Sequence, residues 1–213
     1  MCDPQDPELP DRSLRIYEIN GYWRESGVLS PGDWNAYSLG YLEALQGLIK
    51  LVKERRFLFD TFGYPIFFLF HHYLEIRMKE IIINGRILID ESPDFPRTHN
   101  LNHLWIECKR ILQEIEGWSE YSQLDDDLRQ NFLTIDHFIS EMAVDNSAQS
   151  FRYPEDINRN LLLNDPRIQR LNVHNIAIVA NWMSFVFEGF STEIDEEINA
   201  KRESMPRCRE EFQ

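Results

Sequence analysis

The sequence FFLFHHYLEIRMKEIIING, residues 67–85, decides the fold because it is apolar on almost every side. Plotted at about 100° per residue, its aromatic and aliphatic side chains cover nearly the full circumference of a helix. A helix that is hydrophobic all round is a buried helix. The sequence therefore predicts a central helix here, with neighbouring elements packed on all its sides.

Three polar residues share one side of this helix. His72, Glu75 and Lys79 fall within about 60° of one another, and Glu75 precedes Lys79 in the favourable i,i+4 order for an ion pair. Buried polar groups need partners inside the protein or a chemical role. Two interpretations stay open: a buried pair that fixes the packing, or a carboxylate that orients Lys79 or His72 toward a cleft and shifts the pKa of that group.

Helical periodicity continues on both sides of the central segment. Asp33 is a suitable cap for the helix before it, and Thr98 or Asn100 for the helix after it. Pro65 suits the first turn of the central helix, and Gly85 suits the C′ position after its end. Besides the central helix, the pattern predicts helices over 33–56, 98–117, 124–146 and 171–192.

The predicted elements define a fold class. About five helices, with no confident strand and no internal repeat, predict an all-α helical bundle. We expect an irregular N-terminal arm over 1–33, the bundle over 34–192, and a charged tail over 193–213 that frays after Asp195.

Composition limits the partners and the compartment. The formal net charge of −14 argues against broad, charge-driven binding to nucleic acid or anionic membranes, although it permits a local basic site. Three widely spaced cysteines are typical of a reducing cytoplasm rather than a disulfide scaffold. No apolar run approaches the ~18 residues that span a bilayer, and the N-terminus has no signal core. The sequence predicts a cytoplasmic protein without a membrane span.

A second polar cluster lies in THNLNHLW, residues 98–105. His99 and His103 have the i,i+4 spacing with which a helix can bind a metal. However, His99 falls at or before the helix cap, and no third ligand is evident, so we expect neither a metal nor a cofactor. We expect His99 to bond to backbone or to a nearby carboxylate, for which Glu75 is a candidate.

A third cluster lies in a loop between two strong helices, where functional residues concentrate. There Arg152 stands between Phe151 and Tyr153, so we expect aromatic packing to hold its guanidinium. That guanidinium could bond to Asp145, to Glu75 or to a phosphate. A structural clamp and a functional arginine both remain open.

Three motifs in this order resemble a known family. FHHYLEIRMKEIIING, THNLNHLW and FRYPED, followed by a final helix, resemble prokaryotic HEPN-domain proteins over residues 34–192. The resemblance implies a HEPN-like helical bundle that is usually dimeric. It also implies that the chain is related to metal-independent ribonucleases of toxin–antitoxin and antiphage-defence systems.

The resemblance also implies candidate catalytic residues. In HEPN ribonucleases four to six residues separate an Arg from a His near the last helix. The His acts on the RNA 2′-hydroxyl and the Arg stabilises the phosphorane charge. Arg152 does not fit this spacing, because positions 157–159 are Ile, Asn and Arg. Arg167 does fit, with six residues between it and His174. Arg167 and His174 are therefore catalytic candidates, and Arg152 is a third because of its place in the loop.

Three functional interpretations follow. The first is an RNA-cleaving effector that acts as a homodimer, with RNA as substrate and an antitoxin or sensor protein as partner. The second is a non-catalytic module that binds a partner protein or a nucleotide-like ligand, and the third is an acidic helical protein whose polar core only fixes packing. The predicted polar pocket consists of His72, Glu75, Lys79, His99 and Asp145.

Overall fold

The computed structural model describes residues 29–55, 59–115, 126–143, 149–162 and 170–204. The chain divides into two compact units, Met1–Gly32 and Asp33–Gln213, and the account below concerns the second. Within the described ranges this unit is all-helical, which confirms the predicted fold class. Its elements are α1 (Trp34–Glu54), α2 (Phe59–Leu88), α3 (Leu101–Ile115), α4 (Asp126–Met142), the 3-10 turn η5 (Gln149–Phe151) and α5 (Val173–Ser204).

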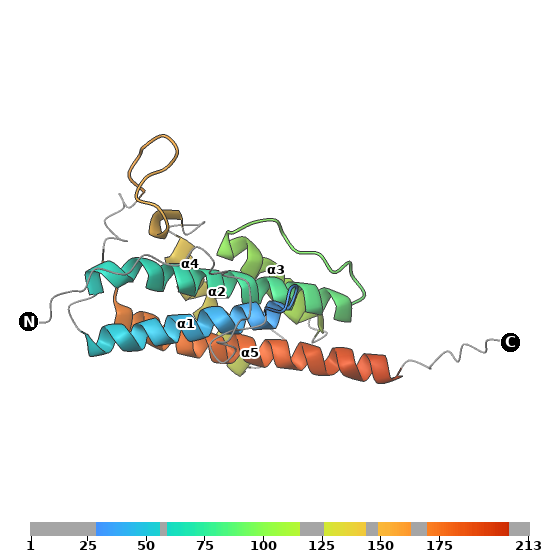
Figure 1. Ribbon diagram of the computed structural model, residues 1–213. Coiled ribbons are helices and arrows are strands. Elements are labelled where there is room, and N and C mark those ends of the chain that lie inside the picture. Colours follow the sequence, from blue (N-terminus) through green and yellow to red (C-terminus); the bar gives the residue numbers. More distant parts are fainter. Residues whose placement is uncertain (1–28, 56–58, 116–125, 144–148, 163–169, 205–213) are drawn as a thin grey trace, which may run out of the picture. The chain divides into compact units, whose positions relative to one another are not determined.

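Helix α2 is the central element of the bundle. It contacts α1, α3, α5 and η5, and Figure 1 shows α1, α2 and α5 running alongside one another. Because neighbours cover it on all sides, even residues one position apart along α2 are buried. Tyr73, Leu74, Met78, Ile81 and Ile82 are fully buried. The central helix predicted from the sequence is confirmed.

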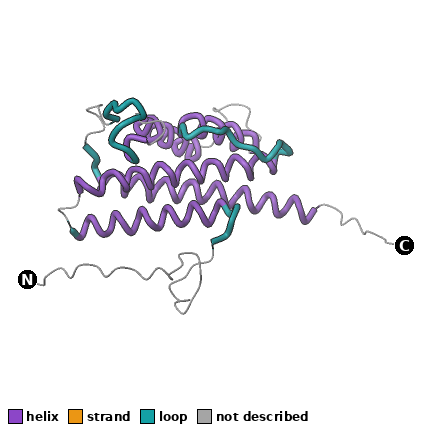
Figure 2. Tube along the Cα trace, turned by 45° about the horizontal axis from the view of Figure 1, so that its top comes forward, coloured by secondary structure: helices purple, strands orange, loops and turns teal. Residues whose placement is uncertain are grey.

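Helices α3 and α4 complete the core on another side of α2 (Figure 2). The buried Trp105 ring of α3 lies edge-on to Phe132 of α4 and to Phe187 of α5, with centroid distances of 5.4 and 5.7 Å. Its indole Nε1 donates to Asp136 at 2.7 Å, which satisfies the polar atom of an otherwise apolar side chain. These aromatic contacts tie three helices together.

The predicted caps begin two helices, but α2 begins earlier than predicted. Asp33 accepts a hydrogen bond from the Ala36 N–H at 2.9 Å, and Asn100 accepts one from the His103 N–H at 3.2 Å. Pro65 was predicted in the first turn of the central helix, yet α2 already starts at Phe59. Pro65 is tolerated there because it removes only one hydrogen bond, near the start of a long helix.

The predicted stop at Gly85 is wrong. Gly85 lies inside α2, where an added Cβ would meet Ile111 of α3 at 2.3 Å, so the glycine is needed for close helix packing. The helix ends instead at Leu88, and Asp90, in the turn that follows, adopts the left-handed conformation with φ of 61°. The Glu91 N–H donates to the Arg86 carbonyl at 2.8 Å across this turn, as in a Schellman motif.

The expectation that the chain frays after Asp195 is also wrong, because α5 continues to Ser204. Ile194 and Ile198 are buried, and Lys201 donates to the Leu88 carbonyl at 3.0 Å and to the Asp90 carboxylate at 2.7 Å. The charged side chains of this segment lie on its outer side, while its apolar side chains extend the core.

The sequence also predicted no confident strand and no membrane span. Within the described residues the β contacts amount to one isolated antiparallel bridge, between Glu155 and Leu161. None of the described helices combines the length and the apolar character needed to cross a membrane.

Candidate functional site

A buried carboxylate gathers the polar residues predicted on α2 and at the start of α3. The Lys79 Nζ lies 2.6 Å and the His99 Nδ1 2.9 Å from Glu75 Oε1, and the His72 Nδ1 lies 3.8 Å from Glu75 Oε2. The predicted bond between His99 and Glu75 is confirmed. We call these four residues, His72, Glu75, Lys79 and His99, the Glu75 cluster.

The cluster keeps Glu75 ionised. Burial by itself raises the pKa of the Glu75 carboxyl, but the neighbouring His72, the hydrogen-bonded Lys79 and the charges on Lys79 and His99 outweigh it. Together they lower this pKa from 4.5 to about 2. The carboxylate is therefore a fixed negative charge to which three basic groups are directed.

His99 is the member of the cluster that faces solvent. Its side chain is 68% exposed, whereas the Glu75 side chain is 7% exposed. Because Nδ1 bonds to a carboxylate, which accepts hydrogen bonds, Nδ1 carries the proton in the neutral imidazole and Nε2 is the basic nitrogen. A carboxylate-oriented imidazole with a free Nε2 is suited to accept a proton from a bound molecule.

Aromatic rings form the walls around the cluster. His72 packs edge-on against Tyr41 of α1 at 4.4 Å and stacks on Phe68 at 5.5 Å between centroids. On the other side, the Phe95 ring lies under both Lys79 Nζ, at 5.3 Å, and the Arg97 guanidinium, at 4.8 Å. These rings hold the basic groups in place and limit the water around them.

Arg152 lies beside the cluster but does not bond to it. Its guanidinium carbon lies 5.6 Å from the centre of the Phe68 ring and 5.4 Å from that of Tyr153. Aromatic packing of this guanidinium was predicted, although Phe151 stacks instead on Phe67 at 3.9 Å. The guanidinium makes no ion pair within the described part of the chain, so the candidate bond from Arg152 to Glu75 is absent.

The other candidates are not joined to the cluster. Asp145 and Arg167 lie outside the described residues. His174 is exposed on the first turn of α5, and no contact among the described residues links it to Glu75. His103 is exposed and lacks the carboxylate contact of His99. The described residues contain no group of three or more His, Cys, Asp or Glu side chains arranged to hold a metal ion.

Sequence analysis missed a second polar cluster, around Arg77 on α2. Its guanidinium, 1% exposed, donates to Glu80 and to Glu188 of α5 at 2.9 Å each, and to Asn35 of α1 at 3.3 Å. It also lies 3.5 Å from the Ser191 hydroxyl. The i,i+3 spacing of Arg77 and Glu80 on a helix apolar all round was the available signal for this buried clamp.

The Arg77 clamp has a different chemical character from the Glu75 cluster. Burial raises the pKa of Tyr73 to about 12, and burial together with Asp195 and Glu188 raises the pKa of Glu80 despite Arg77. The Tyr73 hydroxyl is buried and has no hydrogen-bond partner among the described residues. Glu188 and Asn35 are exposed, whereas Arg77, Glu80 and Ser191 are buried, so the clamp joins α1, α2 and α5 from inside the bundle.

Comparisons with known proteins give no family for this chain. No protein-family model matches it, and neither the curated proteins nor the solved structures contain a significant match.

Proposed function

We propose that this chain is a HEPN-like effector of a prokaryotic defence or toxin–antitoxin system that cleaves RNA without a metal ion. The observation that carries the proposal is the buried Glu75 carboxylate, which bonds to His99 at 2.9 Å and lies 3.8 Å from His72. Two imidazoles at one carboxylate supply both a base and an acid, the pair that RNA transesterification requires.

The proposed reaction uses these groups in sequence. The His99 Nε2 accepts the proton of an RNA 2′-hydroxyl, and the resulting oxygen attacks the adjacent phosphorus. The 5′-oxygen leaves with a proton from the protonated His72, which yields a 2′,3′-cyclic phosphate and a 5′-hydroxyl. Lys79 and Arg152 supply positive charge for the phosphorane. Arg152 takes the role that the resemblance gave to Arg167, and His99 replaces His174 as the proposed base.

Replacing His99 by Ala should lower the rate of RNA cleavage about 100-fold, which is the lower end of the range expected when a general base is lost. The measurement is single-turnover cleavage of a labelled single-stranded RNA in EDTA. His103→Ala is the matched control, because this exposed imidazole lies four residues after His99, in the first turn of α3. The His103→Ala variant should cleave RNA at the rate of the wild type.

Three other results would contradict parts of the proposal. Loss of cleavage in His174→Ala but not in His99→Ala would place the chemistry at the start of α5, as the Arg167/His174 spacing implies. Cleavage unchanged by every one of these variants would indicate a contaminating nuclease. Absence of cleavage by pure wild-type protein would reject a ribonuclease.

The alternative is a non-catalytic module that binds a nucleotide-like ligand or a partner protein. It is favoured by Arg152, whose guanidinium lies over two rings without an anionic partner among the described residues. If no cleavage occurs, a melting temperature that rises with nucleotide or RNA in the wild type but not in Arg152→Gln would favour this alternative.

We also propose that the protein is a cytoplasmic homodimer, with an antitoxin or sensor protein as a further partner. On the outer side of α4 and α5, Leu133, Ile178 and Phe185 are 48%, 56% and 80% exposed. Ile178 also lines a depression whose lining holds no charged residue and consists of Gln130, Asn131, Thr134, Phe138, Ile178, Val179 and Trp182. Copies with a net charge of −14 repel one another, so an uncharged face favours their association.

Phe185→Glu should therefore convert a dimer into a monomer, because it places a charge in an apolar interface. The measurement is molar mass by light scattering during gel filtration. Glu193→Gln, an exposed substitution further along α5, is the control and should leave the mass unchanged. A wild type that is monomeric at all tested concentrations would contradict the proposed homodimer.

A further inference from the structure

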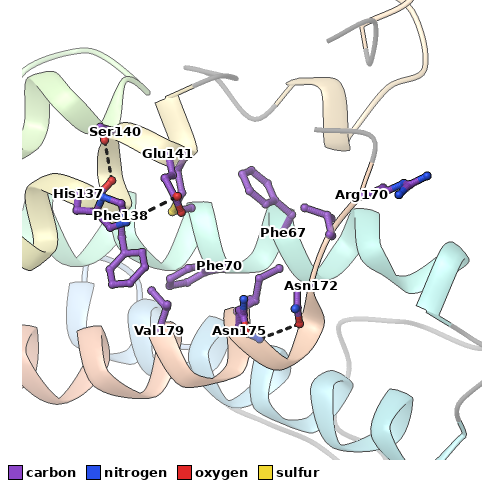
Figure 3. A pocket seen from close by; sticks show the side chains of 13 residues that line it. Phe67, Phe70, His137, Phe138, Ser140, Glu141, Arg170, Asn172, Asn175 and Val179 are labelled. Carbon is purple, nitrogen blue, oxygen red and sulfur yellow. Dashed lines mark hydrogen bonds and ion pairs between the residues drawn. The ribbon is translucent and has the colours of Figure 1, made fainter. Parts of the chain in front are cut away.

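A cleft apart from the Glu75 cluster lies between the end of α4 and the start of α5, with α2 as its floor. Its volume is about 530 Å³, within the range of small-molecule sites. Figure 3 shows the rings of Phe67, Phe70 and Phe138 around it. Phe67 and Phe70 are buried in the core, 8% and 3% exposed, so rigid packing holds this aromatic floor in place.

The rim of the cleft is polar and differs between its two ends. Figure 3 shows Arg170 on one side of the view and the pair of His137 and Glu141 on the other. The His137 Nε2 lies 3.7 Å from a Glu141 carboxylate oxygen, so the acidic side chain of Glu141 has a basic neighbour. Arg170 is exposed and makes no ion pair within the described part of the chain. The Arg170 end of the rim thus carries a positive charge that none of the described residues pairs.

Two asparagines stand beside Arg170. The Asn172 side chain caps α5 by accepting from the Asn175 N–H at 3.1 Å, so its oxygen is occupied while its amide N–H groups remain donors. Asn175 also lines the cleft, beyond Asn172 as seen from Arg170 in Figure 3. One end of the cleft therefore offers hydrogen-bond donors and a cation, and its floor offers aromatic rings. These features determine which kind of ligand fits the cleft.

We propose that this cleft binds a small planar aromatic acid. The rings of the ligand lie against Phe67, Phe70 and Phe138, where offset or edge-on contacts between aromatic groups are favourable. Its carboxylate bonds to Arg170, which can offer two parallel N–H donors. Glu141 at the opposite end disfavours a second negative charge, so the ligand carries one anionic group.

The test is calorimetric titration of the full chain with 1-naphthoate and with the uncharged 1-naphthalenemethanol. The wild type should bind naphthoate more tightly than the alcohol. Arg170→Gln should weaken naphthoate binding about ten-fold, because it removes a hydrogen bond to a charged group, and should leave the alcohol unaffected. Arg202→Gln, at an exposed arginine near the end of α5, is the matched control.

A second variant tests the position of the rings. Val179 lines the cleft and is partly buried, so Val179→Trp should fill the space and weaken both probes at least ten-fold. Its far-UV circular dichroism and its melting curve show whether it is folded. If it is not, Arg170→Gln alone decides the outcome.

The proposal is overturned by any of three results. These are no binding of naphthoate to the wild type, equal affinity for the acid and the alcohol, or naphthoate binding that Arg170→Gln leaves unchanged. None of these results depends on RNA cleavage, so the proposal and the ribonuclease proposal fail separately.

Discussion

We expect Arg77→Met to lower the free energy of unfolding by about 3–5 kcal/mol, the cost of leaving a buried charge without its partner. The substitution removes the cation and keeps an unbranched side chain of similar length. Glu80, 5% exposed at its side chain, would then lie in the core without its partner at 2.9 Å. The measurement is urea-induced unfolding at pH 7.5, followed by circular dichroism.

Two controls separate the buried charge from the loss of side-chain contacts. Arg77→Met combined with Glu80→Leu removes both charges, and we expect it to recover most of the loss, since apolar replacements of buried ion pairs are often neutral. Arg97→Met removes an arginine that is 81% exposed and pairs with Asp94 at 3.8 Å, so it should change stability by less than about 1 kcal/mol. A double variant as unstable as Arg77→Met would contradict the assignment of the loss to Glu80.

The pH dependence of Arg77→Met has a definite sign. The pKa of Glu80 is already raised by burial, and losing Arg77 removes the main influence that lowers it. A carboxyl whose pKa is higher in the folded than in the unfolded state favours folding as the pH falls. The stability difference between wild type and Arg77→Met should therefore be smaller at pH 5 than at pH 7.5.

The central helix and the His99–Glu75 bond could be predicted because each depends on local pattern. An apolar circumference at 67–85 requires burial wherever the neighbours lie. Likewise, a histidine just before the Asn100 cap leaves its side chain free to reach a carboxylate on an adjacent helix. Arg77 was overlooked because its partners Glu188 and Asn35 are distant in sequence, and only the packed bundle brings them within 3.3 Å.

The errors at helix ends have tertiary causes. Gly85 satisfies the local rule for a C′ residue, but the close approach of Ile111 uses the glycine inside the helix instead. Asp90 takes over the left-handed position, where Lys201 from α5 bonds to its carboxylate at 2.7 Å. The same lysine, with the buried Ile198, holds the part of α5 past Asp195 against the end of α2. Local helix propensity cannot predict this contact, because it joins residues that are distant in sequence.

We expect Glu75→Gln to lower the free energy of unfolding by about 3–5 kcal/mol as well, because it leaves the Lys79 ammonium unpaired at 10% exposure. The shape of the side chain hardly changes, so the loss reports the charge. Glu75→Leu combined with Lys79→Met should recover most of it. Glu141→Gln is the matched control, because its partner His137 and Glu141 itself are 63% and 64% exposed, and it should cost under about 1 kcal/mol.

Acid should remove the difference between wild type and Glu75→Gln. The pKa of Glu75 is lowered from 4.5 to about 2 in the folded state, so its contribution to stability is complete above pH 4.5. As the pH falls from 4.5 toward 2, the unfolded state gains a proton before the folded state does, and the contribution is lost. Unfolding free energies of both proteins at pH 7, 4 and 3 should converge stepwise. A difference that stays constant over this range would mean that Glu75 is not held as an anion by Lys79 and His99, and the proposed orientation of the His99 imidazole would lose its physical basis.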